Sequence, residues 1–216
     1  MVQRRLIFSL CLLLLGVVAG CGETRQLNPT SSQPSATSAS PESAWKTLKG
    51  NGVALSVPET YAGGNPKTDL DAIAQKLKQI DPDYEKRIES LKNDPSAPAL
   101  LAFDMQSAES NFPTNVSVAT QKVPQDLTVE EYLDAVVKQI SNEAKVIDQK
   151  VVSLENYQAG RIVTESTIGE IAISQLFYLI KDDNKFWLVI YATTSGEFQE
   201  RLPNFEKSIR SLTFSS

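Results

Sequence analysis

The sequence predicts an α+β domain with a central antiparallel sheet flanked by helices. Four strand-like segments follow one another between Val146 and Thr193, and the links between them are only a few residues long. Short links join antiparallel neighbours, whereas parallel strands need a long crossover. Segments with helical periodicity precede and follow this region, from Thr128 to Ile140 and from Phe198 to Leu212. Two such helices can cover a sheet, so we expect helices to flank it.

The first 20 residues have the organisation of a bacterial secretory signal. Arg4 and Arg5 come first, an apolar segment runs from Leu6 to Val18, and small residues precede Cys21. The apolar segment has about 13 residues, short of the roughly 20 that a membrane-spanning helix needs. We therefore expect residues 1–20 to be a cleaved signal peptide rather than a retained transmembrane helix.

The run Val18-Ala19-Gly20-Cys21 resembles the lipobox of bacterial lipoproteins. The resemblance implies cleavage between Gly20 and Cys21, lipidation of Cys21 on sulfur, and a further fatty chain such as palmitate on its amine. Several acyl chains give durable membrane attachment. We therefore expect a lipoprotein anchored outside the cytoplasm, on the periplasmic, outer-membrane, thylakoid-lumenal or cell-surface side.

Residues 21–47 are predicted to form a flexible tether. Ser, Thr, Pro, Gln and Ala dominate its composition, and large apolar side chains are scarce. Such a segment buries too little apolar surface to offset the entropy of ordering. The globular domain is therefore expected at residues 48–216, with Trp45 packed against it where the tether meets the domain; a contact between Trp45 and a partner is the alternative.

The first part of the domain is predicted to be a strand followed by a helical excursion. Val53 to Val57 has strand character, and the run Gly63-Gly64-Asn65-Pro66 indicates a turn. A helix is expected to begin at Thr68, and a second helix is expected to begin at Asp81-Pro82 and end near Asn93. The apolar stripes on these two helices are Leu70, Ile73, Leu77 and Ile80 on the first, and Tyr84, Ile88 and Leu91 on the second.

The remaining elements follow from periodicity and capping. Thr128-Val129-Glu130-Glu131 fits a capping box at the start of the 128–140 helix. In the last helix Pro203 interrupts an apolar stripe, so we expect a bend near Leu202 with Pro203 starting a fresh helical turn. The expected strands are Leu100 to Met105, Val116 to Val123, Val146 to Leu154, Gln158 to Ser166, Ile171 to Ile180 and Lys185 to Thr193.

Composition excludes several function classes. The chain has no histidine, its net charge is −5, and loss of Arg4 and Arg5 with the signal lowers the net charge to −7. Cys11 lies in the signal and Cys21 is expected to carry lipid, so the domain holds no free thiol or disulfide. Histidine- and thiol-based catalysis and the usual zinc sites therefore have no residues to use. No basic stripe is present, so neither nucleic-acid binding nor a polybasic membrane contact is expected.

Carboxylate clusters have simpler explanations than catalysis or metal binding. Asp182-Asp183-Asn184 lacks the spacing of a calcium loop and fits a hairpin turn. Glu130 and Glu131 are neighbours in a helical first turn and point about 100° apart, which fits capping rather than glycoside chemistry. The remaining carboxylates have two expected roles. Helix capping is expected for Asp69, Asp71, Asp81, Asp83 and Glu85, and exposure to solvent is expected for Glu165 and Glu170.

Two further features are assigned to structure rather than function. Trp187 lies in an apolar strand and is expected in the core or on a sheet face rather than in a ligand platform. Asn115-Val116-Ser117 matches a glycosylation sequon, but the bacterial lipid signal makes the match incidental. The sequence therefore indicates no metal, no cofactor and no catalytic residue.

Four segments of the chain, taken in order, carry a family resemblance. They are Gly52-Val53-Ala54-Leu55-Ser56-Val57-Pro58 with Tyr61; Asn115-Val116-Ser117-Val118; Leu127-Thr128-Val129-Glu130-Glu131-Tyr132-Leu133; and Phe205-Glu206-Lys207-Ser208-Ile209-Arg210-Ser211-Leu212-Thr213-Phe214. They resemble elements of the PsbP-like family, and the resemblance covers about residues 48 to 214. It implies the PsbP-like α/β/α sandwich, a fold found in extrinsic photosystem II subunits, cyanobacterial lipoprotein relatives and other bacterial lipoproteins.

The resemblance favours a non-catalytic module that binds or helps to assemble a protein partner, whose identity the sequence does not indicate. Three alternatives remain open. The first is a carrier with a small-ligand pocket between the sheet and the helices of residues 68–93, which a large apolar cavity would favour. The second is a hydrolase, which buried carboxylates converging in a cleft would support. The third, for a cyanobacterial source, is a photosystem II-associated lumenal lipoprotein, although the long excursion and the absence of metal-binding histidines depart from the photosystem subunits.

Overall fold

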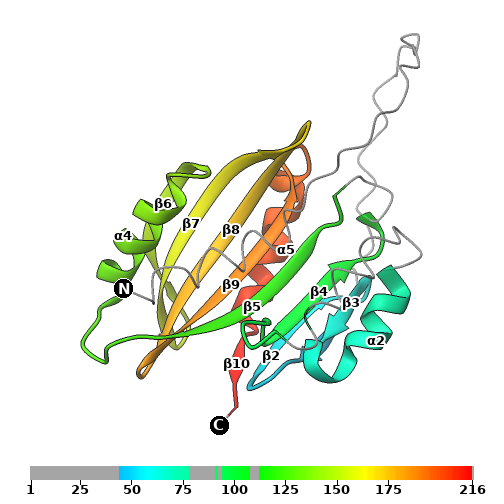
Figure 1. Cartoon of the computed structure of the whole chain (residues 1–216), viewed down its shortest axis with the longest axis horizontal. Coiled ribbons are helices and arrows are strands. Elements are labelled where there is room, and N and C mark those ends of the chain that lie inside the picture. The colour runs from blue at the N-terminus through cyan, green and yellow to red at the C-terminus, as the bar shows by residue number, and fades with distance from the viewer. Residues whose placement is uncertain (1–43, 78–90, 92–93, 108–111, 216) are drawn as a thin grey trace.

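A seven-stranded antiparallel sheet, with strand order β3-β4-β5-β9-β8-β7-β6, is the centre of the structure (Figure 1). The computed structural model describes residues 44–77, 91, 94–107 and 112–215. All neighbouring strands in this sheet run antiparallel, as expected for an α+β fold. The strands are β3 (Tyr61–Gly64), β4 (Leu100–Asp104), β5 (Asn115–Lys122), β6 (Lys145–Leu154), β7 (Tyr157–Ile168), β8 (Ile171–Asp182) and β9 (Lys185–Thr194).

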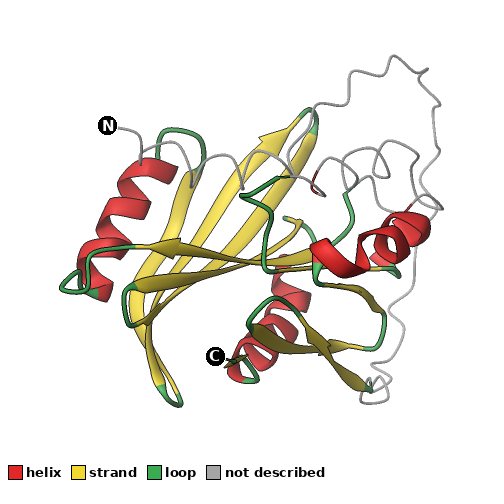
Figure 2. Ribbon diagram, turned by 60° about the horizontal axis from the view of Figure 1, so that its bottom comes forward, coloured by secondary structure: helices red, strands yellow, loops and turns green. Residues whose placement is uncertain are grey.

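A second, three-stranded sheet lies against one face of the first. It consists of β1 (Trp45–Lys49), β2 (Val53–Pro58) and β10 (Thr213–Phe214), in the order β1-β2-β10. Figure 2 shows this small sheet on the same side of the large sheet as helix α5 (Phe198–Arg210). The expectation of one central sheet did not include this unit, because β10 has only two residues and gives no periodic signal.

The two faces of the large sheet bury separate apolar cores. Helix α4 (Val129–Ile140) covers one face, where it packs against side chains of β7, β8 and β9 such as Ile162, Phe177 and Leu188. Helix α5 and strand β2 cover the other face, which carries Tyr178 and Val189. Residues 173–180 of β8 are all buried, because successive side chains enter opposite cores.

The start of α4 confirms the predicted capping box. The side-chain oxygen of Thr128 accepts a hydrogen bond from the Glu131 N–H at 3.2 Å, and the Glu131 carboxylate accepts from the Thr128 N–H at 2.9 Å. The reciprocal bonds satisfy two backbone donors that the first turn leaves open. The buried face of α4 consists of Val129, Tyr132, Leu133, Val136 and Ile140, and Val137 is only partly buried.

The prediction for Pro203 was wrong, because α5 is one continuous helix with Pro203 inside it. Proline removes the hydrogen bond that would reach the carbonyl of Gln199, a cost that usually breaks a helix. Gln199 and Pro203 both face solvent, so water can reach that carbonyl. Phe198 and Phe205, on either side of the proline, are buried in the core and hold both halves of the helix on the sheet.

The region after β2 differs from the prediction in two places. Gly63 and Gly64 belong to strand β3 rather than to a turn. A Cβ on Gly63 would lie 2.2 Å from the Leu101 carbonyl oxygen, so glycine permits the close approach of β3 to β4. Helix α2 (Pro66–Leu77) begins two residues before Thr68. The predicted second helix lies outside the described residues except for Leu91, which is buried.

The described domain begins before the expected boundary at residue 48. Strand β1 starts at Trp45, which pairs with Pro58 of β2. The Lys207 ammonium of α5 lies 4.5 Å from the centre of the Trp45 ring, so Trp45 packs against the fold as predicted. Among the described residues, no helix is long and apolar enough to cross a membrane.

Truncation of Phe205 tests the core beneath α5. This side chain is 2% exposed and stacks on Tyr191 with ring centres 4.8 Å apart. We expect Phe205→Ala to lower the free energy of unfolding by about 3–5 kcal/mol, because it leaves a cavity among buried rings. Urea unfolding measures the loss. Ile147, which is 46% exposed, supplies the control: Ile147→Ala should change stability by only about 0.5 kcal/mol. Equal effects would contradict the assigned core.

Candidate functional site

Strand β5 is longer than its neighbour β4, and this difference creates the candidate site. The pairing of β5 with β9 extends to Lys122 opposite Lys185, whereas its pairing with β4 ends at Val118 opposite Leu100. Figure 1 shows β5 continuing past β4 toward α4. Residues 119–122 therefore have a strand neighbour on one side only, within the described part of the chain.

The register shows which backbone groups this free edge presents. The Val123 N–H donates to the Asn184 carbonyl at 2.9 Å, and the Thr114 carbonyl accepts from the Asp104 N–H at 2.8 Å. Successive residues of a strand direct their N–H and C=O groups alternately to the two neighbours. Thr120 and Lys122 thus point these groups away from β9, where no described residue forms a hydrogen bond with them.

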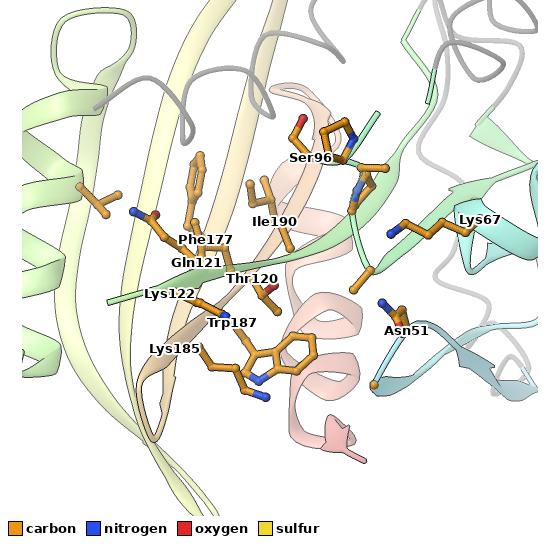
Figure 3. Close-up of a pocket in the computed structure, with 18 of the residues that line it drawn as sticks. Asn51, Lys67, Ser96, Thr120, Gln121, Lys122, Phe177, Lys185, Trp187 and Ile190 are labelled. Atoms are coloured by element: carbon orange, nitrogen blue, oxygen red, sulfur yellow. The ribbon is translucent and has the colours of Figure 1, made fainter. Parts of the chain in front are cut away.

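An open groove surrounds this free edge. Its volume is about 550 Å³, within the range of ligand sites, roughly 300–1,000 Å³. Figure 3 shows the groove on both sides of β5, with Phe177 and Ile190 on the α4 side and Trp187 on the α5 side. Residues 95–99, Asn51 and Gly52 form the wall opposite the edge. The groove is open to solvent, so it is a surface feature.

Three lysines line the groove. Lys122 and Lys185 are directly opposite each other on β5 and β9, and Lys67 comes from the first turn of α2 (Figure 3). The carboxylate of Asp182 lies 3.1 Å from the Lys185 ammonium and accepts a hydrogen bond from the Trp187 indole at 3.1 Å. Asp182 therefore holds the Lys185 and Trp187 side chains in place. Lys67 and Lys122 form no ion pair within the described part of the chain.

The groove offers binding groups but no catalytic set. The described lining residues include no Asp, Glu, Cys, His or Tyr. The Ser96 hydroxyl donates to Asp94 at 2.6 Å, but this bond and that from the Ser96 N–H lower the pKa of the Asp94 carboxyl. A carboxylate with a lowered pKa is a weaker base, so Asp94 does not activate Ser96.

Those carboxylates singled out in the sequence that the structure describes are not brought together. No three Asp, Glu, His or Cys residues within the described ranges lie close enough to hold a metal ion. The Asp182-Asp183-Asn184 run forms the β8–β9 hairpin turn, with Asp183 at a positive φ of 52°. Asp69 has the predicted capping role, because it accepts from the Asn65 N–H at 2.9 Å. Glu165 and Glu170 are exposed.

Other candidates lie elsewhere or outside the described residues. Trp187 is 3% exposed and belongs to the core, as predicted, and it also lines the groove. Asn115 is buried in β5, where its amide donates to the Pro113 carbonyl. Gly20 and Cys21, the predicted cleavage and lipidation residues, lie outside the described residues, as do Asp81, Asp83 and Glu85.

A buried ion pair that the sequence analysis missed joins the large sheet to α5. The Arg201 guanidinium donates to Asp104 and to Glu197, each at 2.7 Å, and Asp104 is only 3% exposed. Burial, with the nearby Asp104 carboxylate adding to it, raises the pKa of Tyr61 above its ordinary value. The Arg201 guanidinium and the two carboxylates neutralise one another's charge, so the cluster has a structural role. Removing one partner would leave a buried charge unpaired.

Comparison with known proteins adds evidence on the fold. No family model matches the sequence, and no curated protein matches it. Among solved structures, the cyanobacterial PsbP (CyanoP) of Synechocystis sp. PCC 6803 matches 83% of this chain and 98% of its own length, with a TM-score of 0.51 and 11% identity. LpqN of Mycobacterium tuberculosis matches 80% of this chain and 91% of its own length, also with a TM-score of 0.51 and 11% identity. The predicted PsbP-like fold is confirmed; identity this low supports no more than the fold.

Amide hydrogen exchange tests the free edge of β5. We expect the Thr120 and Lys122 amides to exchange rapidly, because their N–H groups face solvent in the groove. The Ala119 and Gln121 amides, directed at β9, should be protected at least about 100-fold more strongly. Val116 and Val118 are the controls, since their amides face β4 and should also be protected. Uniform protection from Val116 to Lys122, measured by NMR, would show that the edge is covered.

Proposed function

We propose that this protein is a lipid-anchored extracytoplasmic module that binds a protein partner and catalyses no reaction. The main support for protein binding is the groove around the free edge of β5. Its exposed backbone donors and acceptors at Thr120 and Lys122 are a template for another strand, and edge strands recruit partners in this way.

The location and manner of attachment rest on the N-terminal sequence. The lipobox-like run ending at Cys21 supports lipid attachment, and residues 22–44 separate that cysteine from the first described strand. A segment of this length and composition spans about 25 Å. A domain held at that distance can reach partners near the membrane surface.

The non-catalytic assignment is supported by the chemistry of the groove. General acid–base and nucleophilic catalysis need a titratable group or an activated nucleophile beside the substrate. The described lining supplies lysines, amides, hydroxyls and apolar groups, which bind and orient. Two solved proteins of similar fold are a cyanobacterial PsbP and LpqN, the second of which is involved in cell envelope biogenesis. A shared fold alone does not select a partner.

A small-ligand carrier is the second candidate, because the groove volume of about 550 Å³ suits a ligand. The carrier hypothesis required a large apolar cavity, whereas the groove is open and is lined by lysines, amides and hydroxyls as well as by apolar side chains. The exposed backbone N–H and C=O groups of the β5 edge also require a partner that has both hydrogen-bond acceptors and hydrogen-bond donors. These features favour an extended protein segment over a small apolar ligand.

Replacement of Cys21 tests the anchor. We expect Cys21→Ala to move the protein from the membrane fraction to the soluble fraction after export or to leave the leader uncleaved, because no acyl chain can be attached. Fractionation and mass spectrometry of the intact chain measure the outcome. Gly22→Ala is the matched control and should remain lipidated. An unmodified cysteine in the native chain would contradict the lipoprotein assignment.

Photo-crosslinking tests the partner. A photoreactive residue in place of Thr120, in the full lipidated chain in its native membrane, should give a discrete crosslinked protein, because this exposed position lies on the groove edge. Ser153, exposed on the edge strand β6, is the control position and should give none. Identical crosslinks from both positions, or none from Thr120, would contradict protein binding in the groove.

A further inference from the structure

The charge of the groove differs from that of the whole chain. The protein carries a net charge of −5, yet the ionisable side chains among the described lining residues are the cations Lys67, Lys122 and Lys185. Lys185 has Asp182 as an ion-pair partner, which leaves the charges of Lys67 and Lys122 uncompensated within the described ranges. This local excess of positive charge attracts an anionic partner.

The arrangement of two of these lysines is itself unfavourable. Lys122 and Lys185 are directly opposite on neighbouring antiparallel strands and extend to the same face of the sheet. Like charges in such a cross-strand pair destabilise the sheet. The Asp182 carboxylate, 3.1 Å from the Lys185 ammonium, offsets part of this repulsion. A partner carboxylate beside Lys122 would offset more of it, so anion binding favours the pair.

The backbone of the edge distinguishes among anionic partners. Thr120 and Lys122 present carbonyl oxygens as well as N–H groups toward the groove. A phosphate group or a lipid headgroup phosphate offers acceptor oxygens, which satisfy the N–H groups and leave the carbonyls unpaired. A peptide in extended conformation supplies both donors and acceptors in the required alternation.

The two sides of the groove also differ in character. Side chains of a strand added beside β5 would point alternately to the two faces of the sheet. One face carries Lys122, Lys185 and Trp187. The other carries Phe177 and Ile190, which line the groove but are only 2% and 4% exposed (Figure 3). Alternate residues of the added strand would therefore meet positive charge on one side and the apolar floor of the groove on the other.

We propose that the partner contributes an extended segment of alternating acidic and apolar residues, which adds to the edge of β5 at Thr120 and Lys122. Its carboxylates contact Lys122 and Lys185, and its apolar side chains contact Phe177 and Ile190. This inference rests on the proposed protein-binding function and names the chemistry of the segment that is bound.

Titration of the full lipidated chain in neutral-lipid nanodiscs tests the proposal. The probes are end-blocked hexapeptides that alternate Glu with Val, Gln with Val, or Lys with Val. We expect the Glu-Val peptide to bind at least about tenfold more tightly than the Gln-Val peptide, to weaken with added salt, and to slow exchange of the Thr120 and Lys122 amides. Equal binding of the Glu-Val and Gln-Val peptides, or unchanged exchange, would overturn the proposal.

Charge reversal supplies the second arm. Lys122→Glu combined with Lys185→Glu should weaken Glu-Val binding at least about tenfold and should strengthen Lys-Val binding. The matched control reverses two exposed lysines on β6, Lys145→Glu with Lys150→Glu, and should leave both affinities unchanged. Loss of binding in the control as well would overturn the site, and the gain for Lys-Val shows that the groove variant is folded.

The remaining outcomes separate this inference from the proposed function. Binding of the native chain to anionic vesicles but not to the Glu-Val peptide would overturn the peptide segment in favour of a lipid headgroup. A crosslinked partner at Thr120 that is retained by the Lys122→Glu, Lys185→Glu variant would overturn the acidic segment alone. Peptide binding without any crosslinked partner would contradict the proposed function and leave the groove chemistry intact.

Discussion

Burial of both faces of the seven-stranded sheet is the constraint on which the rest of the structure depends. Strands β8 and β9 carry large apolar side chains on both sides, so neither face can be left to water. Helix α4 covers one face, and α5 with the small sheet covers the other. Hydrogen bonds from buried hydroxyls hold α5 against the large sheet and against the small sheet. The Tyr191 hydroxyl donates to the Ser208 hydroxyl of α5, and the Ser208 hydroxyl donates to the Ser56 carbonyl of β2.

The groove follows from the same constraint. Strand β5 pairs with β9 as far as Lys122 and then leads into α4, which covers the first face. Strand β4 has only five residues, and the chain before it, residues 95–99, leaves the sheet and forms the groove wall. The unequal lengths of β4 and β5 leave Thr120 and Lys122 of β5 with backbone groups that no described residue pairs.

The charges around this edge favour an anionic partner. The acidic chain as a whole repels anionic partners at long range, and the lysines of the groove reverse that tendency locally. Asp182 restrains Lys185 and the Trp187 ring, so part of the groove is ordered before a partner arrives. Pre-ordered groups lose less conformational entropy on binding.

The sequence by itself determined the local features of this protein: the α+β class, the four-strand meander, the capping box at Thr128 and the expected lipid site at Cys21. Each depends on periodicity or on a short motif, which neighbouring residues specify. Tertiary structure alone decided the small sheet, the uninterrupted α5 and the groove. Pro203 is tolerated because Phe198 and Phe205 are buried on either side of it. Lys122 and Lys185, 63 positions apart, become neighbours only through strand register, which depends on long-range pairing.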